Sequence, residues 1–378
     1  MPRKSAPPSF PFRALFKKSS VTTLVAILSY LIYELIAHGQ HAAAPAPEQV
    51  RLPASNEAVQ LYSNQTNDDL TNLYLSAIQS AKKSITFVIY ALMDPQIIAA
   101  LQQKSEEGVP VYIVCDAKAS MGISRKLPKA TIVRRIGQGL MHQKILIIDE
   151  TQILLGSANM TTDSLRVHGN LVMGIENPAL AQAMTAKAKS MDEEGHSTPL
   201  PHIETQAGPQ KVELWMLPDD PQAAKRVIEL LRSAKKTIRV AMFTWTRTDF
   251  TQELIDAAKR GVQVEAVIDR YSGKGASAKI VRMLDQAGIS VRLSTGHGLL
   301  HHKFAYIDGN ILINGSANWT NNAFKNNDDY FVVLYPLTTE QQTKMNQLWQ
   351  TIQRQSEKPG NAPKDGSKKK KEKVPYFE

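Results

Sequence analysis

Residues 137–159, GQGLMHQKILIIDETQILLGSAN, place a His and a Lys before an apolar run and end it with Gly-Ser-Ala-Asn. Residues 296–318, GHGLLHHKFAYIDGNILINGSAN, repeat the pattern in the same register. Upstream stretches also match: SAKKSITFVIYALM at 80–93 matches SAKKTIRVAMFTWT at 233–246, and EEGVPVYIVCD matches KRGVQVEAVID. A self-similarity of this length predicts a tandem duplication.

The apolar runs of each copy predict an α/β fold. ITFVIYAL and VPVYIVC are too continuous for half-exposed strands and are typical of strands covered on both faces by helices. KILIID and ILLGSAN are expected to form a hairpin, for which Asp308-Gly309-Asn310 is the stronger turn signal in the second copy. We expect two duplicated α/β/α sandwich halves packed about a pseudo-two-fold axis.

Composition predicts where the halves begin and end. The stretch between the copies is rich in Pro, Gly and charge, which is typical of a linker, and the lysine-rich end is typical of disorder. The predicted segments are a basic N-terminus 1–20, a transmembrane anchor or signal sequence 21–37, a linker 38–58, a first half 59–190, a linker 191–210, a second half 211–357 and a disordered basic tail 358–378.

The apolar segment Val21–Ala37 is just long enough to cross a bilayer, since a helix rises about 1.5 Å per residue and the hydrocarbon core is about 30 Å thick. A cleaved signal peptide is the alternative, with Ala37-His38-Gly39 as a possible cleavage site. Prolines follow the small-residue sites within 42–46, which favours an anchor. Basic residues flank only its N-terminal side, so we expect the body on the periplasmic or extracellular side, or secreted if cleavage occurs.

The formal net charge of +10 lies mostly at the two ends of the chain. The body between them is close to neutral, which argues against a dedicated surface for duplex nucleic acid. The single cysteine, Cys115, lies in the apolar run VYIVCDA. It excludes an intramolecular disulfide and a thiolate metal site, and we expect it in the core.

The two motifs predict a site for a phosphodiester. Residues two apart on a strand face the same side, so His142 and Lys144 point together, as do His301 and Lys303. If the halves pack about a pseudo-axis, all four side chains can meet in one cleft. The polar groups expected to bind or orient phosphate beside them are Ser157, Asn159, Ser316 and Asn318.

The complete pattern is HxK, four residues, Asp, six residues and GSxN, present twice. It resembles the signature of the phospholipase D superfamily, in a compact bacterial type, over both halves from Leu61 to Trp349. The resemblance implies that one His attacks phosphorus and the other protonates the leaving alkoxide, with the lysines on the non-bridging oxygens and no metal or cofactor. It also implies structural roles for the motif residues Asp149, Asp308, Gly156 and Gly315.

The two halves depart from each other at one position. The resemblance implies a carboxylate that orients the motif His of the other half. The second half has Asp329 there and the first has Asn170. We therefore expect Asp329 to orient His142 and raise its basicity, which makes His142 the nucleophile and His301 the general acid.

Further side chains are weaker candidates. His168 could reach the cleft, but a position at the surface or behind the groups that contact substrate is favoured. His302 is expected on the opposite strand face, and Asp116 and Asp269 in a turn or the framework at strand ends. Phe243, Trp245 and Trp319 are expected either to line a cleft or to pack in the core. The remaining histidines lie in linkers or flank the second motif, at positions 38, 41, 196, 202 and 297.

Three functions remain open. The first is a phospholipase D-type enzyme that hydrolyses or transfers the phosphatidyl group of phospholipids. The second is a membrane-anchored, metal-independent endonuclease, and the third is an inactive binding protein. The anchor and the near-neutral body favour a phospholipid or membrane surface over nucleic acid. Because both motifs are complete, an inactive binding protein with a decayed site is the least favoured function. The internal pseudo-dimer predicts that a monomer holds a whole site.

Overall fold

The computed structural model describes residues 50–360, and Arg51 begins one compact unit that holds both halves of the duplication. The predictions for 1–20 and 21–37, most of the linker 38–58 and the tail from 361 onward lie outside the described residues. Within 50–360, no helix is long and apolar enough to cross a membrane.

The first half is built on a seven-stranded sheet in the order β1-β7-β6-β5-β2-β3-β4. Its strands are β1 (Gln60–Tyr62), β2 (Ile85–Ile89), β3 (Val111–Asp116), β4 (Thr131–Arg135), β5 (Lys144–Ile148), β6 (Gln152–Gly156) and β7 (Val172–Glu176). Its helices are η1 (Asn64–Thr66), α2 (Leu70–Ser80), α3 (Pro95–Glu106), α4 (Ile123–Lys126), α5 (Thr162–Arg166) and α6 (Pro178–Lys189).

The second half has a nine-stranded sheet in the order β16-β12-β11-β10-β13-β14-β15-β9-β8. Its strands are β8 (Ile203–Ala207), β9 (Gln210–Leu217), β10 (Thr237–Met242), β11 (Gln263–Ile268), β12 (Ser290–Ser294), β13 (Lys303–Ile307), β14 (Ile311–Gly315), β15 (Asp329–Tyr335) and β16 (Ser356–Glu357). Its helices are α7 (Ala223–Ser233), α8 (Thr248–Lys259), α9 (Arg270–Lys274), α10 (Ala278–Gln286), α11 (Asn321–Lys325) and α12 (Thr339–Arg354).

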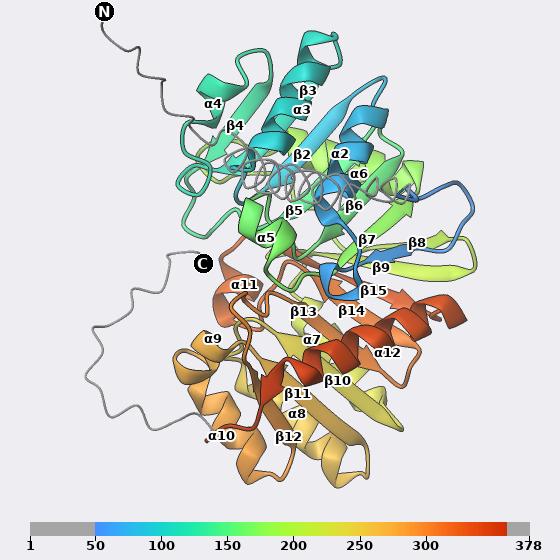
Figure 1. The fold of residues 1–378 in the computed structure, drawn as a ribbon, viewed down its shortest axis with the longest axis vertical. Helices are drawn as coiled ribbons and strands as arrows, with labels where there is room; N and C mark the ends of the chain where they lie inside the picture. The colour runs from blue at the N-terminus through green and yellow to red at the C-terminus, as the bar shows by residue number, and fades with distance from the viewer. Residues whose placement is uncertain (1–49, 361–378) are drawn as a thin grey trace, which may run out of the picture. The chain divides into compact units, whose positions relative to one another are not determined.

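The two sheets share one topology, which confirms the duplicated α/β fold. In the first half β2 pairs parallel with β3 and antiparallel with β5, and in the second half β10 pairs in the same way with β11 and β13. The predicted hairpins are β5–β6 and β13–β14. Figure 1 shows the halves one above the other, with β5, β6 and β7 of the first facing β13, β14 and β15 of the second.

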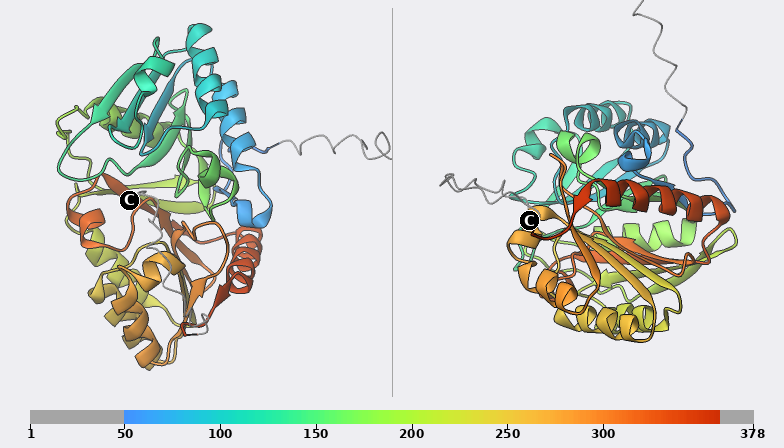
Figure 2. Two further views of the ribbon diagram at one scale, coloured as in Figure 1. Left: turned by 60° about the vertical axis from the view of Figure 1, so that its left-hand side comes forward. Right: turned by 60° about the horizontal axis from the view of Figure 1, so that its bottom comes forward.

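The inner faces of both sheets share one hydrophobic core. It joins side chains of β5, β6 and β7 to side chains of β9 and β15, and helices α6 and α12 close it. In Figure 2 (right), α12 runs along the boundary between the halves. The outer face of the second sheet packs separately against α7, α8 and α10. In each half, helices therefore cover the outer face of the sheet. The inner face packs against one helix, α6 or α12, and against the other half.

The segment 191–210 is more ordered than the predicted linker. It contains β8, which pairs antiparallel with β9 and covers an edge of the second sheet. Ile203 and Thr205 alternate with the exposed Glu204, a strand pattern that the neighbouring Pro, Gly and charged residues obscured.

Candidate active site

Both motif histidines lie at the same kind of sheet edge. His142 lies two residues before the start of β5, and His301 lies two residues before the start of β13. Lys144 pairs with Ile89 at the end of β2, and Lys303 pairs with Met242 at the end of β10. The antiparallel pairing thus carries each motif to the carboxyl ends of the parallel strands, where ligand sites of open α/β sheets lie.

His142 is held by the other half of the molecule. Its Nδ1 lies 2.8 Å from Oδ1 of Asp329, and both side chains are buried. Its backbone N–H donates to the carbonyl oxygen of Asp328 at 2.9 Å, and Asp328 N–H donates to the Leu140 carbonyl oxygen at 2.9 Å. Backbone and side chain of the His142 loop are therefore both fixed by the 328–329 segment, which is the crossed pairing expected from the sequence.

His301 is held in the same way by the first half, but by an amide. Its Nδ1 lies 2.9 Å from Oδ1 of Asn170, and its backbone N–H donates to the Gly169 carbonyl oxygen at 3.0 Å. The Asn170 Nδ2 donates to the carbonyl oxygens of Ser164 and His168. These bonds turn Oδ1 toward His301.

The partners fix the tautomers of both rings. Carboxylate and amide oxygens can only accept, so Nδ1 carries the proton in both histidines and Nε2 holds the ring lone pair in the neutral form. The partners differ in charge. Asp329 can stabilise a positive charge on the ring of His142, whereas Asn170 offers His301 only a dipole.

The motif serines act on these partners. Ser157 Oγ donates to Asn170 Oδ1 at 2.8 Å, and Ser316 Oγ donates to Asp329 Oδ1 at 2.6 Å. Each hydroxyl also accepts the backbone N–H of the residue that follows its partner, Leu171 for Ser157 and Tyr330 for Ser316. Both serines therefore orient the residue that orients a histidine, which is the orienting part of their expected role.

The motif lysines lie beside the histidines of their own half. Lys144 Nζ donates to the His142 carbonyl oxygen at 2.7 Å, and Lys303 Nζ donates to the His301 carbonyl oxygen at 3.1 Å. The ring centroid of Tyr90 lies 5.2 Å from the ring centroid of His142 and 5.1 Å from Lys144 Nζ. Phe243 occupies the matching position in the second half. Its ring centroid lies 5.1 Å from the ring centroid of His301 and 4.9 Å from Lys303 Nζ. The aromatic faces restrict how the cations and imidazoles can move.

The motif asparagines are buried at the same edge. Asn318 Oδ1 accepts from Thr244 N–H at 3.2 Å. Asn159 N–H donates to Ser164 Oγ, and its buried Oδ1 has no hydrogen-bond partner among residues 50–360.

The motif glycines allow two strands to approach closely. A Cβ at Gly156 would lie 2.2 Å from the Leu171 carbonyl oxygen, and one at Gly315 would lie 2.4 Å from the Tyr330 carbonyl oxygen. Leu171 and Tyr330 directly follow Asn170 and Asp329. Glycine is therefore needed to bring the histidine partners into place.

The motif aspartates lie at the far ends of β5 and β13, seven residues after the histidines and so roughly 20 Å from them along each strand. Both have positive φ, and each carboxylate accepts backbone N–H groups of the turn before β2 or β10. Burial works to raise the pKa of Asp149, but the amides of Ser84, Lys83 and Lys82 outweigh it and lower the pKa. These contacts fit a structural role.

A buried ion pair braces the His142 side of the interface. The Arg135 guanidinium contacts the Asp328 carboxylate at 2.9 Å and the carbonyl oxygens of Asp192, Gly195 and His196. Burial raises the pKa of Asp328, and Arg135 opposes that shift. Because Asp328 precedes Asp329, Arg135 helps to fix the partner of His142.

Both halves of the chain are similar to known proteins. The family described as cardiolipin synthase, PLD-like domain matches residues 74–191 and 227–349, one segment in each half. The chain belongs to the phospholipase D superfamily. A mitochondrial cardiolipin hydrolase of Chlamydomonas reinhardtii is 34% identical over 131 residues, which cover 34% of this chain and 58% of that protein. A phospholipase D of Rickettsia typhi is 32% identical over 110 residues, 29% of this chain and 53% of that protein.

A solved structure shares the whole duplicated fold of this phospholipase D-like chain. The phosphatidylserine synthase of Haemophilus influenzae superposes with a TM-score of 0.61 over 81% of this chain and 88% of that one. At 12% sequence identity, the likeness concerns the fold alone.

The weaker candidates separate into neighbours of the phospholipase D-like site and framework. His168 Nδ1 accepts from the Leu299 N–H. Burial lowers the pKa of His168, the charge of Asp163 opposes this shift, and the charge of Lys303 adds to it. His302 faces away, with Nε2 at 2.6 Å from Gln65 Oε1, as alternation predicted. Trp245 and Trp319 pack edge to face in the core, so of the three aromatic candidates only Phe243 lies against the site.

Asp116 and Asp269 support the histidine loops. One carboxylate oxygen of each aspartate accepts an N–H of the turn after its own strand. The other oxygen accepts the N–H of the residue before the motif histidine, which is Met141 for Asp116 and Leu300 for Asp269. Burial raises the pKa of Asp269. The framework role predicted from their positions at strand ends is consistent with these bonds.

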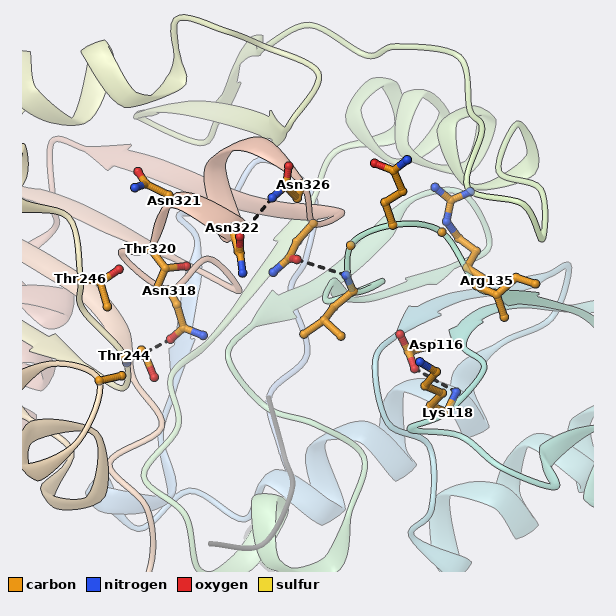
Figure 3. A pocket seen from close by; sticks show the side chains of 17 residues that line it. Asp116, Lys118, Arg135, Thr244, Thr246, Asn318, Thr320, Asn321, Asn322 and Asn326 are labelled. Atoms are coloured by element: carbon orange, nitrogen blue, oxygen red, sulfur yellow. Dashed lines mark hydrogen bonds between the residues drawn. The ribbon is translucent and has the colours of Figure 1, made fainter.

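A polar cleft of about 710 Å³ opens beside Asn318. Figure 3 shows Thr244, Thr246, Asn318 and Asn322 on one wall and Asp116, Lys118 and Arg135 on the other. The first wall comes from the second half and the other from the first. The cleft therefore lies between the two halves, next to the phospholipase D-like site at Asn318, and many of its lining groups are hydroxyls and amides.

Sequence inspection missed Tyr90, Arg135 and Tyr330. Tyr90 could have been found, because the repeat aligns it with Phe243. The Tyr330 hydroxyl donates to the carbonyl oxygens of Lys144 and Gly156, across the interface between the halves. Nothing in the sequence near Tyr330 or Arg135 indicates these partners in the other half.

Proposed function

We propose that the protein is a phosphodiesterase of the phospholipase D type that acts on phospholipids through a phosphohistidine. The observation that carries this proposal is the crossed pairing, in which each half holds the motif histidine of the other by Nδ1. A pair of imidazoles oriented in this way supplies one nucleophile and one proton donor.

In the first step, Nε2 of His142 attacks phosphorus and the bond from phosphorus to the alkoxide breaks. His301, protonated on Nε2, gives its proton to the departing oxygen. In the second step, water attacks phosphorus while His301 takes a proton from it. The phosphorus–nitrogen bond breaks, and the electron pair returns to His142. An alcohol in place of water gives transfer instead of hydrolysis.

The unequal partners support this assignment. Attack through Nε2 leaves positive charge on the His142 ring, and the adjacent Asp329 carboxylate stabilises that charge. Asn170 is neutral, so His301 more readily gives up its proton. Lys144 and Lys303 are proposed to hold the non-bridging oxygens, where negative charge builds in the transition state, with Asn159 and Asn318 as neutral donors.

The choice of phospholipid is supported by the relatives, which are described as a cardiolipin hydrolase and a phospholipase D. It also rests on the apolar segment Val21–Ala37, which would tether the body beside a bilayer. Placement of the body on the non-cytoplasmic side remains part of the proposal.

The test incubates the full-length chain in EDTA with phosphatidylglycerol, phosphatidylcholine, single-stranded DNA and RNA, with His142→Asn as the control. We expect lipid turnover that the variant lacks. Cleavage of nucleic acid without lipid turnover would replace the proposal by the endonuclease. A folded protein that turns over none of the four would be the binding protein.

A further inference from the structure

The loop between β3 and β4 is strongly basic. In residues 117–130 the side chains of Lys118, Arg125, Lys126 and Lys129 are all exposed, and the segment contains no acidic residue. Short helix α4 carries two of these cations. The loop therefore presents a local positive charge on a body that is otherwise close to neutral.

Large exposed apolar side chains gather at the same edge of the first sheet. Among residues 50–360 they are Met93 (50% exposed), Met121 (76%), Ile136 (66%) and Val167 (53%). Met93 follows β2, Met121 follows β3 and Ile136 follows β4. Val167 follows α5, which begins after β6, the neighbour of β5. All four therefore lie at the edge that carries His142.

Hydrogen bonds join these positions into one rim. Ser120 Oγ donates to the Tyr90 carbonyl oxygen and accepts from Leu92 N–H, which brings Met121 next to the end of β2. Arg166 donates to Gln96 at the start of α3, which links Val167 to Met93. Ile136 and Lys118 line the same cleft. We call the four apolar side chains and the four cations the first-half rim.

The second half has no such rim. Among the described residues, none of the large exposed apolar side chains belongs to it. Its matching loop, at α9, exposes Lys274, Gly275 and Ala276. In Figure 1, α4 and α9 lie on the same side of their respective halves, so the two loops flank the active-site edge with different chemistry.

We propose that the first-half rim docks on a bilayer containing anionic phospholipid. Exposed Lys and Arg side chains are attracted to anionic headgroups, and the aliphatic and thioether side chains between them enter the interface. Nucleic acid fits less well, because no aromatic side chain is among these exposed residues to stack on bases. The inference rests on the proposed function, since docking here would bring headgroups to the cleft beside His142.

Insertion can be measured with a fluorophore on a single cysteine. Cys115 is the one native cysteine and is buried, and burial raises the pKa of its thiol to about 11, so it resists maleimide. An environment-sensitive dye is attached to full-length Met121→Cys and, as control, to Glu107→Cys at the opposite end of β3. Vesicles contain equal parts of phosphatidylcholine and phosphatidylglycerol.

The dye at position 121 is expected to shift to the blue and to be quenched by brominated lipid, while the dye at 107 does neither. Any attachment through residues 1–49 acts on both proteins alike. The difference between the dye responses at 121 and 107 therefore measures insertion of the first-half rim. Equal responses at both positions, or none at 121, would overturn the proposal. A response at 121 to single-stranded DNA but not to vesicles would make the rim a nucleic-acid surface.

Charge reversal tests the cations. Arg125→Glu, Lys126→Glu and Lys129→Glu together are expected to weaken binding to the vesicles at least about tenfold. They should leave turnover of monomeric short-chain phosphatidylglycerol unchanged. The matched control reverses Lys82, Lys235 and Lys236, which are exposed at the far ends of the sheets, and should keep vesicle binding. Equal loss in both triple variants would overturn the proposal.

These measurements separate two failures. If the protein turns over no lipid, the proposed function fails, yet the dye at position 121 still reports whether the rim enters a bilayer. If lipid is turned over and the dye does not respond, docking fails and the proposed function stands.

Discussion

The side chains of Asp329 and Asn170 differ only in a carboxylate oxygen against an amide NH2 group, and that difference sets the two histidines apart. The side-chain oxygens of both accept from a histidine Nδ1 and from a motif serine. Asp329→Asn would therefore keep the fold, as Asn170 does in the first half, but would remove the charge behind His142. We expect kcat to fall roughly 10³-fold with an unchanged melting temperature, measured on phosphatidylglycerol in micelles.

The reverse change, Asn170→Asp, is the control. It places a carboxylate behind His301, the proposed proton donor, and kcat should stay within about tenfold of the parent. Equal losses in the two variants would contradict the unequal roles of the histidines.

His302 makes stability depend on pH. Burial, followed by the charges of His301 and Lys303, lowers its pKa from 6.5 to about 3. Below pH 6.5 the unfolded chain binds a proton on His302 and the folded chain does not. The contribution of neutral His302 to the free energy of unfolding is therefore present above pH 6.5 and is lost as the pH falls toward 3.

His302→Gln should flatten the free energy of unfolding across that range, as measured by urea titration. His297→Gln, at an exposed position, should leave the slope as it is. A parent protein whose stability does not change between pH 6.5 and 4 would disprove this source of pH dependence.

Single residues with a fixed place in the repeated motif could be predicted from the sequence. His142, Lys144, Asp149 and their repeats stand in a spacing that two copies make unmistakable. Arg135 and Tyr330 could not be predicted, because their partners belong to the other half and only the packed interface brings them together.

At the scale of elements, Gly315 fixes how close β15 comes to β14. The side chain of Gly315→Ala would meet the Tyr330 carbonyl oxygen at 2.4 Å, and this backbone atom cannot turn aside. Because Asp329 precedes Tyr330, we expect a loss of about 1–3 kcal/mol in unfolding free energy and a fall in kcat. Urea denaturation and turnover of phosphatidylglycerol give the two values.

Gly296→Ala is the matched change. A Cβ there would have no neighbour nearer than 3.9 Å, so stability and kcat should both be kept. If Gly315→Ala had equally little effect, the close approach of the strands would not be what positions Asp329.

The sequence predicted the elements that are apolar along their whole length, such as β2, β3 and the β5–β6 hairpin. Two short edge strands were missed: β1 is only three residues long, and β8 has one buried residue among five. Their pairing depends on the strand beside them more than on their own composition.

At the scale of the whole molecule, the halves share a core and a buried ion pair, so we expect them to unfold as one unit. Arg135→Met would leave the Asp328 carboxylate without its partner at the interface and remove three hydrogen bonds to carbonyl oxygens of the segment 191–210. The expected loss is about 3 kcal/mol or more in unfolding free energy, measured in urea.

Arg232→Met gives the comparison, because its ion pair with Glu253 lies within the second half and Arg232 is 65% exposed. Loss of this ion pair should lower the free energy of unfolding by less than about 1 kcal/mol. Two separate unfolding transitions, with Arg135→Met affecting only one, would show that the halves are independent.

The central claim is that His142 forms the covalent bond to phosphorus. An aryl phosphodiester tests it most directly, because its leaving group needs no proton and the first step can proceed without His301. In His301→Ala the second step lacks its base, so the adduct should accumulate, and peptide mapping after rapid quench should place it on His142. No adduct is expected in His142→Ala. An adduct on His301 in His142→Ala, with none in His301→Ala, would contradict the account.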